Sequence, residues 1–273
     1  MESVRLPEVP MKLRLFTLVL DGMPFIEWHL PVFRSLGLDW EWHIAEGVAK
    51  PQNCTSWCRE IEPRVSRDGT TEYLDRIAAE EPRVKIHRRE SWNGKIEMVN
   101  ATIAGLDRDT LVMQIDSDEL WRAPQIETVA RLFKTRSADS ALFDCRYFVG
   151  PEIAVVRRGG YGNKPGEWLR AFRMRTGMQF ERHEPPVLRG ARIHPLPNGL
   201  TRSFGLVFDH YAYATRKQVE FKMWYYGYTD AVRHWERLQA NTRWPARLRD
   251  FLPWVTDGSI VEKVGPGIFP LAQ

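Results

Sequence analysis

The sequence predicts an α/β fold with a mainly parallel sheet, and three observations lead to this prediction. Residues 12–45 contain a strand, a helix and a second strand, which is the unit that builds a parallel sheet. The apolar run 111–115 is long enough for a buried strand in the middle of that sheet. Asp21, Glu46 and Asp116 each follow a predicted strand. Because ligands of such folds bind beyond the carboxyl ends of the strands, these acids indicate a site there.

The elements of the first half follow from apolar spacing and turn residues. Residues 12–20 are apolar enough for a central strand. A helix is expected over 25–35, where apolar residues recur at helical spacing. The next elements expected are a strand at 40–45, an inserted loop at 48–67, a helix at 68–79, a strand at 84–87 and a helix at 95–104.

The second half is expected to add strands and two helices. One apolar face predicts a helix over 124–134, and residues 216–238 are expected to form one long aromatic helix that packs on the sheet. Pro185-Pro186 is expected to break regular structure. Strands are expected at 141–149, 153–157, 167–175 and 206–213, and the tail from Pro245 is Pro-rich and amphipathic.

Composition and charge narrow the class of protein. The 273 residues allow one large α/β domain or two small ones, and 43% hydrophobic with 27% charged residues is ordinary for a globular protein. A formal charge of +4 without a basic stripe is compatible with a phosphate-bearing substrate or an acidic membrane surface and does not call for nucleic acid.

The cysteines and the termini predict a cytoplasmic protein. Cys54, Cys58 and Cys145 form no disulfide framework, and no second Cys/His pair completes a zinc site near the first two. The N-terminus lacks the apolar core of a secretory signal, and no apolar run approaches the roughly 20 residues of a membrane span. Peripheral contact with the inner face of the membrane stays open.

The acidic stretch after the central strand, LVMQIDSDELW at residues 111–121, is the main candidate site. Asp116 and Asp118 are two apart on an extended chain, so both carboxylates point to the same side. Such like charges repel unless a cation lies between them, and a metal-bound anion such as a nucleotide diphosphate meets this requirement. The alternative is a capped turn in which Asp116 or Ser117 starts a helix at Glu119.

Several stretches of the chain follow one another in this order: FTLVLDGMPFIEWHL, SRDGTTEYL, KIEMVNATIAGL followed by LVMQIDSDELW, FERHEPP and FDHYAY. In this order they resemble the segments of GT-A fold glycosyltransferases of the broad family-2-like group. The resemblance covers about residues 12–228. An insertion separates DGTT from the second strand, and Asp21-Gly22 replaces the more usual Asn-Glu turn.

The resemblance implies a three-layer α/β/α, Rossmann-like domain with a mixed, mainly parallel sheet. Residues 11–215 would form this domain, with a nucleotide-sugar-binding half at 11–120 and an acceptor half at 121–215. Residues 216–273 would form a helical C-terminal extension packed on it. The implied reaction moves a sugar, with inversion, from a UDP- or GDP-sugar to a hydroxyl of a saccharide, glycolipid or other acceptor. A bacterial setting in surface-polysaccharide or glycolipid assembly follows from the resemblance alone.

The resemblance also assigns the metal ligands. Asp118 would bind a divalent cation directly, and Asp116 would bridge the metal and the ribose. His210 would be the third protein ligand, and an imidazole added to carboxylates favours manganese over magnesium. The alternative reading of His210 is a core residue on an apolar strand.

On the acceptor side, Glu184 is the candidate base. Partial burial near Trp168, Phe180 and Pro185 would raise its pKa, which suits a base. The alternative is that Glu184 only caps the Pro-Pro turn. His183 and Trp168 are candidates for binding the acceptor, or pack in the core.

Four further residues are candidates for binding the nucleotide-sugar. Asp21, Glu46 and Asp68 would accept from ring N–H groups and sugar hydroxyls. Asp68 has an alternative as a helix N-cap. Lys95 would reach a phosphate, or is simply solvated.

Two other functional classes stay open. A carboxylate-based hydrolase needs two carboxyls that face each other across the substrate, whereas Asp116 and Asp118 lie side by side. A non-catalytic nucleotide-sugar or carbohydrate binder of the same fold would tolerate Glu184→Gln.

Overall fold

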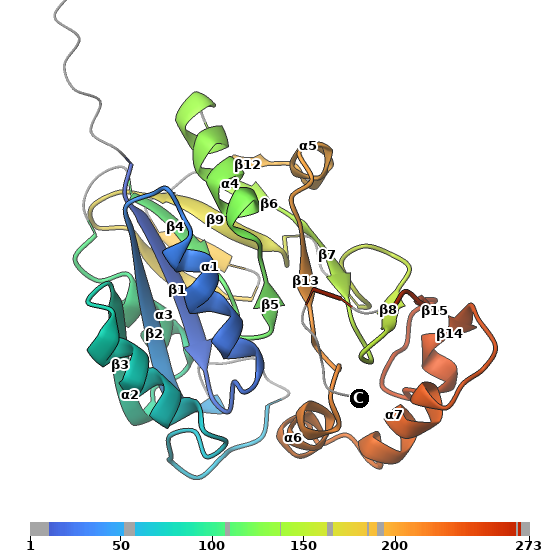
Figure 1. Ribbon diagram of the computed structural model, residues 1–273. Coiled ribbons are helices and arrows are strands. Elements are labelled where there is room, and N and C mark those ends of the chain that lie inside the picture. The colour runs from blue at the N-terminus through green and yellow to red at the C-terminus, as the bar shows by residue number, and fades with distance from the viewer. Residues whose placement is uncertain are drawn as a thin grey trace, which may run out of the picture.

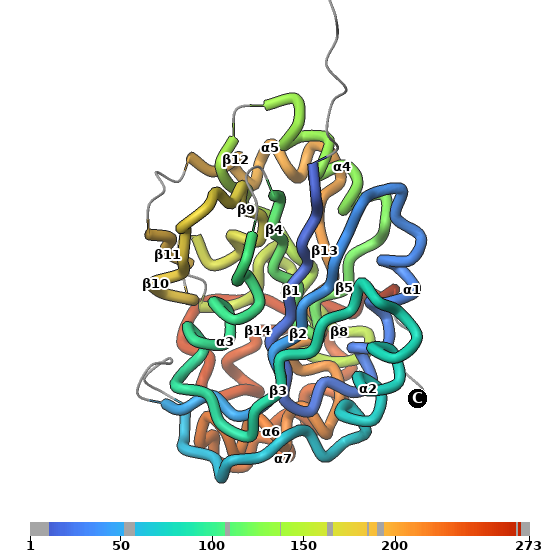
Figure 2. Tube along the Cα trace, turned by 90° about the vertical axis from the view of Figure 1, so that its left-hand side faces the viewer, coloured from blue at the N-terminus to red at the C-terminus, as the bar shows by residue number. Residues whose placement is uncertain are grey.

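One seven-stranded sheet organises the molecule, shown as a computed structural model (Figure 1; Figure 2). The structure describes residues 11–51, 58–106, 110–136, 138–162, 166–184, 186–189, 194–265 and 267–268. The strands of this sheet are β1 (Leu13–Val19), β2 (Trp40–Ala49), β3 (Val84–Trp92), β4 (Thr110–Gln114), β6 (Ser140–Leu142), β9 (Leu169–Met174) and β12 (Pro195–Leu196).

The strand order is β12-β6-β9-β4-β1-β2-β3. The pairs β3–β2, β2–β1, β1–β4 and β6–β12 are parallel, whereas β9 is antiparallel to both β4 and β6. The predicted mixed, mainly parallel α/β sheet is confirmed.

Helices cover both faces of the sheet, because successive side chains of a strand point to opposite faces. Leu13, Leu15 and Val19 of β1 share one core with α1 (His29–Arg34), α2 (Thr70–Glu80) and α4 (Ala123–Thr135). A short 3-10 turn at Phe25–Trp28 leads into α1. On the opposite face, Phe16 packs with α3 (Lys95–Thr102) and with the hairpin of β10 (Gln179–His183) and β11 (Pro186–Arg189). The predicted three layers are therefore present.

A small second sheet connects the acidic stretch to the later part of the chain. It consists of β5 (Glu119–Leu120), β13 (Val207–His210) and β7 (Asp144–Tyr147), with β13 in the middle, and α5 (Asn198–Ser203) precedes β13. His210 is paired with Glu119 in the register of β13 and β5. This pairing brings His210 beside the residues that follow the central strand.

The C-terminal segment closes the carboxyl-terminal end of the sheet. In both views α6 (Arg216–Tyr226) lies beyond the carboxyl end of β1 (Figure 1; Figure 2). α6 and α7 (Ala231–Gln239) share a hydrophobic core with β8 (Ile153–Val155) and the tail. The tail contains β14 (Ala246–Arg247), a 3-10 turn at Leu248–Asp250 and β15 (Ile260–Lys263), which pairs with β8 and β14. This core joins β8 to the residues after 216. The predicted domain boundaries at residues 120 and 215 stay predictions.

The structure corrects several expected elements. The helix expected over 216–238 is two helices, because Gly227 ends α6 at φ 75° and Asp230 adopts φ 50° before α7 begins. The strand expected over 141–149 is divided into β6 and β7. Glu119 lies in β5 and the next helix begins at Ala123, so the helix start expected at Glu119 in the capped-turn alternative is wrong.

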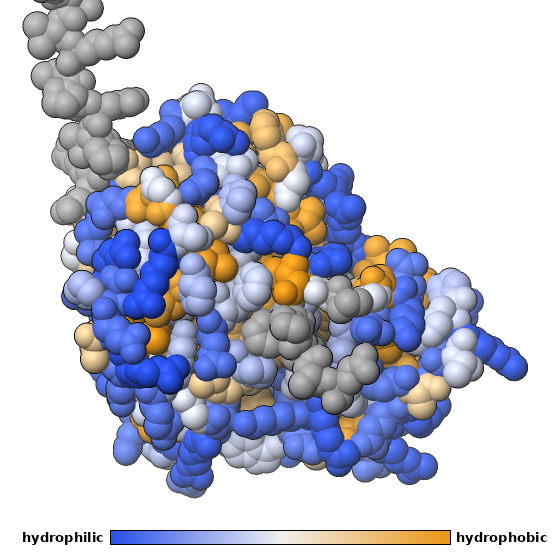
Figure 3. Space-filling model, viewed as in Figure 1, coloured by the Kyte–Doolittle hydropathy of each residue, from blue (hydrophilic) through white to orange (hydrophobic). Residues whose placement is uncertain are grey.

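The expected break at Pro185-Pro186 is also partly wrong. Pro186 is the first residue of β11, where a missing N–H interrupts no ladder. Pro185 and Cys54 lie outside the described residues, while Cys58 and Cys145 are buried. No helix in the described part of the chain is long and apolar enough to cross a membrane. The coloured surface in Figure 3 is mainly hydrophilic, with small separate hydrophobic patches.

Candidate functional site

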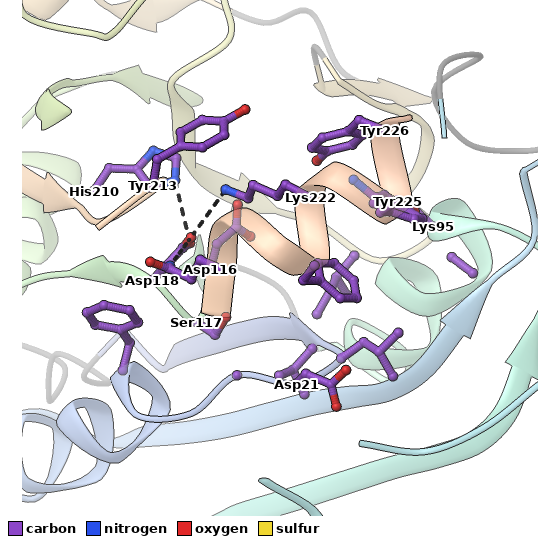
Figure 4. Close-up of a pocket in the computed structure, with 18 of the residues that line it drawn as sticks. Asp21, Lys95, Asp116, Ser117, Asp118, His210, Tyr213, Lys222, Tyr225 and Tyr226 are labelled. Carbon is purple, nitrogen blue, oxygen red and sulfur yellow. Dashed lines mark hydrogen bonds and ion pairs between the residues drawn. The ribbon is translucent and has the colours of Figure 1, made fainter. Parts of the chain in front are cut away.

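A pocket of about 470 Å³ lies where the carboxyl ends of β1 and β4 meet α6. Eight of the ten residues predicted for the site line it, and Figure 4 shows several of them pointing inward from different elements. The eight are Asp21, Lys95, Asp116, Asp118, Trp168, His183, Glu184 and His210. Glu46 and Asp68 are absent from the lining residues that the structure describes.

Neighbouring elements hold the acidic loop after β4 through its backbone. The Thr17 hydroxyl donates to the carbonyl of Ile115 (2.7 Å), and Nε2 of His29 lies 3.0 Å from the carbonyl oxygen of Ser117. Burial lowers the pKa of His29 to about 4, so this imidazole is neutral at pH 7 and donates from Nε2. β1 and α1 therefore fix the loop before any ligand binds.

Asp118 lies close to nitrogen atoms of three other pocket side chains. Its Oδ1 lies 3.5 Å from Nε2 of His210, and its Oδ2 lies 3.5 Å from Nε2 of Gln218 and 4.0 Å from Nζ of Lys222 (Figure 4). Burial by itself raises the pKa of this carboxyl, but His210 and Lys222 outweigh burial and lower the pKa to about 2. Asp118 is thus ionised across the physiological range.

Asp118 and His210 fit a divalent cation as two of its ligands. Oδ1 of Asp118 and Nε2 of His210 lie 3.5 Å apart, so these two side chains would be able to hold one divalent cation together. The His210 ring packs edge-on against Trp168 (5.2 Å between centroids) and Tyr147 (5.0 Å), and its buried Nδ1 has no hydrogen-bond partner among the described residues. No three His, Cys, Asp or Glu in the described ranges form a complete ligand set, so ligand oxygens and water would supply the remaining positions.

Asp116 is held from the opposite side of the loop. Its Oδ1 accepts from the Gln114 amide (3.0 Å), and its Oδ2 lies 3.7 Å from the Arg170 guanidinium. The Arg170 guanidinium forms an ion pair with the fully buried Glu119, with Nη2 of Arg170 2.8 Å from Oε1 of Glu119. Glu119 therefore supports the site by positioning Arg170 and does not line the pocket.

Glu184 and Lys95 form an ion pair across the pocket. Nζ of Lys95 lies 2.8 Å from Oε1 of Glu184, and Nδ1 of His183 lies 3.2 Å from the same oxygen. Burial raises the pKa of Glu184, but the Lys95 ammonium outweighs burial and holds the pKa well below its usual range. The expectation of a raised pKa for Glu184 is therefore wrong in the ligand-free protein. Lys95 is not a solvated surface lysine, because its pair with Glu184 raises its pKa despite burial.

Asp21 and Asp68 fasten the turn after β1 to the inserted loop. Asp21 has a left-handed backbone (φ 56°), and its carboxylate accepts from Arg64 (2.5 Å) and from the Arg67 amide (2.8 Å). Asp68 accepts from the amides of Met23 (2.9 Å) and Thr70 (3.1 Å), the latter at the start of α2. Gly69, and not Asp68, is the N-cap residue of α2, so Asp68 braces the turn before the helix and the N-cap alternative is wrong.

Glu46 lies beneath the surface and not in the pocket. It is fully buried, and its carboxylate accepts from Arg88 (2.5 Å), the Thr71 hydroxyl (2.6 Å) and the Ser66 amide (3.3 Å). These three donors tie β2 to β3 and to the start of α2. We therefore correct its assignment from a ligand-binding acid to a structural one.

α6 supplies pocket residues that the sequence did not single out. Lys217, Gln218, Phe221, Lys222 and Tyr225 follow i, i+4 spacing and line the pocket on one side of the helix. The i, i+4 spacing of these residues is visible in the sequence and would be enough to place them on one side of the helix. Because the segment carries aromatic residues on several faces, packing on the sheet was the simpler interpretation.

No protein family model matches the sequence, and no curated protein matches it. Among solved structures, the chain is similar to residues 1–349 of TarS from S. aureus, at 13% identity and a TM-score of 0.40, over 57% of this chain and 39% of that one. TarS structures with UDP and with UDP-GlcNAc match equally. The mannosyltransferase PcManGT from Pyrobaculum calidifontis, solved with GDP-Man and Mn²⁺, is similar at 14% identity and a TM-score of 0.49, over 90% of this chain and 69% of that one.

A third similar structure is 4-diphosphocytidyl-2C-methyl-D-erythritol synthase, at 13% identity and a TM-score of 0.34, over 60% of this chain and 75% of that one. This chain spans about two fifths of the TarS chain it matches. The parallel order β3-β2-β1-β4 at the centre of the sheet is the α/β arrangement that the sequence predicts. At these identities and TM-scores the likenesses carry no argument about the activity or the substrates of this chain.

Proposed function

We propose that this protein is a glycosyltransferase that moves a sugar from a nucleoside-diphosphate sugar to a hydroxyl acceptor. The observation that carries the proposal is the meeting of Asp118, His210 and Lys222 in one pocket with the Lys95–Glu184 pair. One group of residues suits a metal-bound diphosphate, and the other offers a carboxylate for the acceptor. The proposed donors are UDP- or GDP-sugars, and the proposed acceptors are saccharides or glycolipids.

The donor side rests on the acidic loop. Asp118 and His210 would hold a divalent cation, which as a Lewis acid neutralises the diphosphate leaving group. The imidazole ligand favours manganese over magnesium. Asp116 follows β4 by two residues and is oriented by the Gln114 amide, so it is the candidate for binding the ribose.

The acceptor side rests on Glu184. An ionised carboxylate can take the proton of the acceptor hydroxyl as that oxygen attacks the anomeric carbon, and attack opposite the leaving group inverts the configuration. Pairing with Lys95 weakens Glu184 as a base. If a donor phosphate draws the Lys95 ammonium away, Glu184 becomes more basic when both substrates are present.

A binding panel tests the proposal. UDP, GDP and their sugars are added with Mn²⁺ or with EDTA, and the shift in melting temperature is measured. We expect the rise in melting temperature to be largest when a diphosphate and Mn²⁺ are both present. In Asp118→Ala this rise should be much smaller. A wild-type protein that responds to no nucleotide under either condition would contradict the proposal.

The second candidate is a nucleotide-sugar binder without catalysis, and the Lys95–Glu184 pair favours it because it keeps the carboxylate weakly basic. Release of free nucleoside diphosphate when an acceptor is added distinguishes the two. An enzyme loses this release in Glu184→Gln, whereas a binder shows no release in either protein.

A further inference from the structure

Lys222 places an ammonium inside the pocket next to the acid that is the candidate metal ligand. Its Nζ lies 4.0 Å from Oδ2 of Asp118 (Figure 4), and its side chain is 18% exposed. Nζ also donates to the carbonyl of Ala212 and lies 4.5 Å from the centre of the Tyr213 ring. A carbonyl and an aromatic face therefore hold the charge at this position without neutralising it.

The same face of α6 orients a second donor. Gln218, one turn before Lys222, lies with Nε2 2.6 Å from the carbonyl of Tyr211 and 3.5 Å from Oδ2 of Asp118. Gln218 also accepts from the Thr215 amide at the start of the helix (3.0 Å). These contacts set the rotation of α6, and this rotation directs Lys222 into the pocket.

The distance between Lys222 and Asp118 is longer than that of a direct ion pair. A second lysine of the pocket, Lys95, lies with Nζ 2.8 Å from Oε1 of Glu184, whereas Nζ of Lys222 stays 4.0 Å from Oδ2 of Asp118. Asp118 is also shared with His210. Of these two lysines, Lys222 is the one less tightly bound to a carboxylate, so an anion that binds a metal held by Asp118 lies within reach of its ammonium.

We propose that Lys222 is a second cation for the diphosphate of the donor, in addition to the metal held by Asp118 and His210. This inference rests on the proposed function. As the acceptor oxygen bonds to the anomeric carbon, the bond from that carbon to the diphosphate oxygen breaks and its electron pair stays on that oxygen. Lys222 stabilises the charge that develops there, while the proton of the acceptor goes to Glu184.

Calorimetric binding of inorganic pyrophosphate and UDP, with Mn²⁺ and with EDTA, tests the role of Lys222. Lys222→Gln is expected to weaken pyrophosphate binding about tenfold or more in both conditions, because it removes a charge-assisted contact. Lys222→Arg keeps the charge and is expected to retain most of the affinity. Lys263→Gln removes one charge from an exposed position on β15 and is expected to bind as the wild type does.

A second variant, Asp118→Asn, is expected to change the affinity for pyrophosphate in EDTA in the opposite direction and leaves Lys222 in place. Asp118→Asn removes a metal ligand and also the carboxylate that competes for Lys222. We expect it to lose the Mn²⁺-dependent gain in affinity and to bind pyrophosphate more tightly than the wild type in EDTA. This rise is expected to be absent in Asp118→Asn combined with Lys222→Gln.

Two results overturn the inference. Lys222→Gln that binds pyrophosphate and UDP as tightly as the wild type excludes the role, and so does Asp118→Asn without tighter binding in EDTA. In both cases the proposed function survives if the wild type still binds UDP or GDP. If the wild type binds no diphosphate with or without Mn²⁺, the proposed function and this inference fail together.

Discussion

Nζ of Lys95 lies 2.8 Å from Oε1 of Glu184, although the two residues are 89 positions apart in the sequence. Lys95 begins α3, and Glu184 follows β10, which packs against α3. The contact links the candidate phosphate ligand to the candidate base. It also explains why the pKa of this carboxyl is lowered although burial by itself raises it.

Removing the base should abolish transfer and leave donor binding intact. Glu184→Gln is expected to lower kcat by about 10²- to 10⁴-fold, because the amide cannot take the acceptor proton. The affinity for UDP with Mn²⁺ should change little. Glu181→Gln, an exposed carboxylate on the same hairpin that pairs with Arg189, is the matched control and should keep full activity. Equal activity of both variants would exclude Glu184 as the base.

Removing the partner of that base should raise the pKa of Glu184. Lys95→Met leaves the carboxyl partly buried without its ammonium, so burial and His183 alone determine the pKa. The measurement is a titration of the Glu184 carboxyl carbon by NMR in the ligand-free protein. A carboxyl that still titrates below the usual range in Lys95→Met would show that another group holds it ionised.

The imidazole of His210 should contribute to metal affinity. His210→Gln is expected to weaken Mn²⁺ binding at least about tenfold, because only Asp118 remains of the two ligands. Electron paramagnetic resonance of free Mn²⁺ gives the affinity directly. The control is His194→Gln, an exposed histidine near Asp139. Unchanged Mn²⁺ affinity in His210→Gln would contradict the ligand assignment.

Acidification should destabilise the protein through His29. Its pKa is lowered from 6.5 to about 4 in the folded state, so between these pH values the unfolded chain binds a proton that the folded chain does not. The free energy of unfolding therefore falls as the pH drops from 6.5 to 4, by roughly 3 kcal/mol for this group.

Urea unfolding of wild type and His29→Gln between pH 7 and 4 measures this contribution. The variant should be less stable at pH 7, where it lacks the neutral imidazole, and should lose less stability on acidification. His194→Gln should follow the wild-type profile. Parallel profiles for His29→Gln and wild type would show that His29 titrates normally.

Removing only one partner of the buried ion pair between Glu119 and Arg170 should lower the free energy of unfolding strongly. Arg170→Met leaves the fully buried Glu119 carboxylate without its guanidinium, and such a loss costs about 3–5 kcal/mol. Combining it with Glu119→Leu removes the orphan charge and should restore much of the stability. Urea unfolding of the wild type, of Arg170→Met and of the double variant measures the three stabilities. Equal stability of these three proteins would contradict a buried ion pair.

Local patterns predicted most of the sheet and its helices. Apolar alternation and helical spacing located β1, β4, α2, α3 and α4, because short-range backbone preferences and burial of one face determine these elements. The same patterns misjudged the aromatic segment at 216–238, where Gly227 ends the helix early. They also gave Glu46 a ligand role, since nothing local reveals its pairing with Arg88, 42 residues later.

The sequence by itself determined the α/β class, the strand that carries the acidic stretch, and the acidic residues at the strand ends. Only the tertiary structure decided which charges meet. Lys95 with Glu184, Glu46 with Arg88, and Lys222 with Asp118 are contacts between residues far apart in the chain. Such pairs depend on how packed elements are oriented, and ion pairing in a poorly solvated pocket then sets the protonation of each acid. For Glu184 this reversed the direction of the pKa shift that burial predicts.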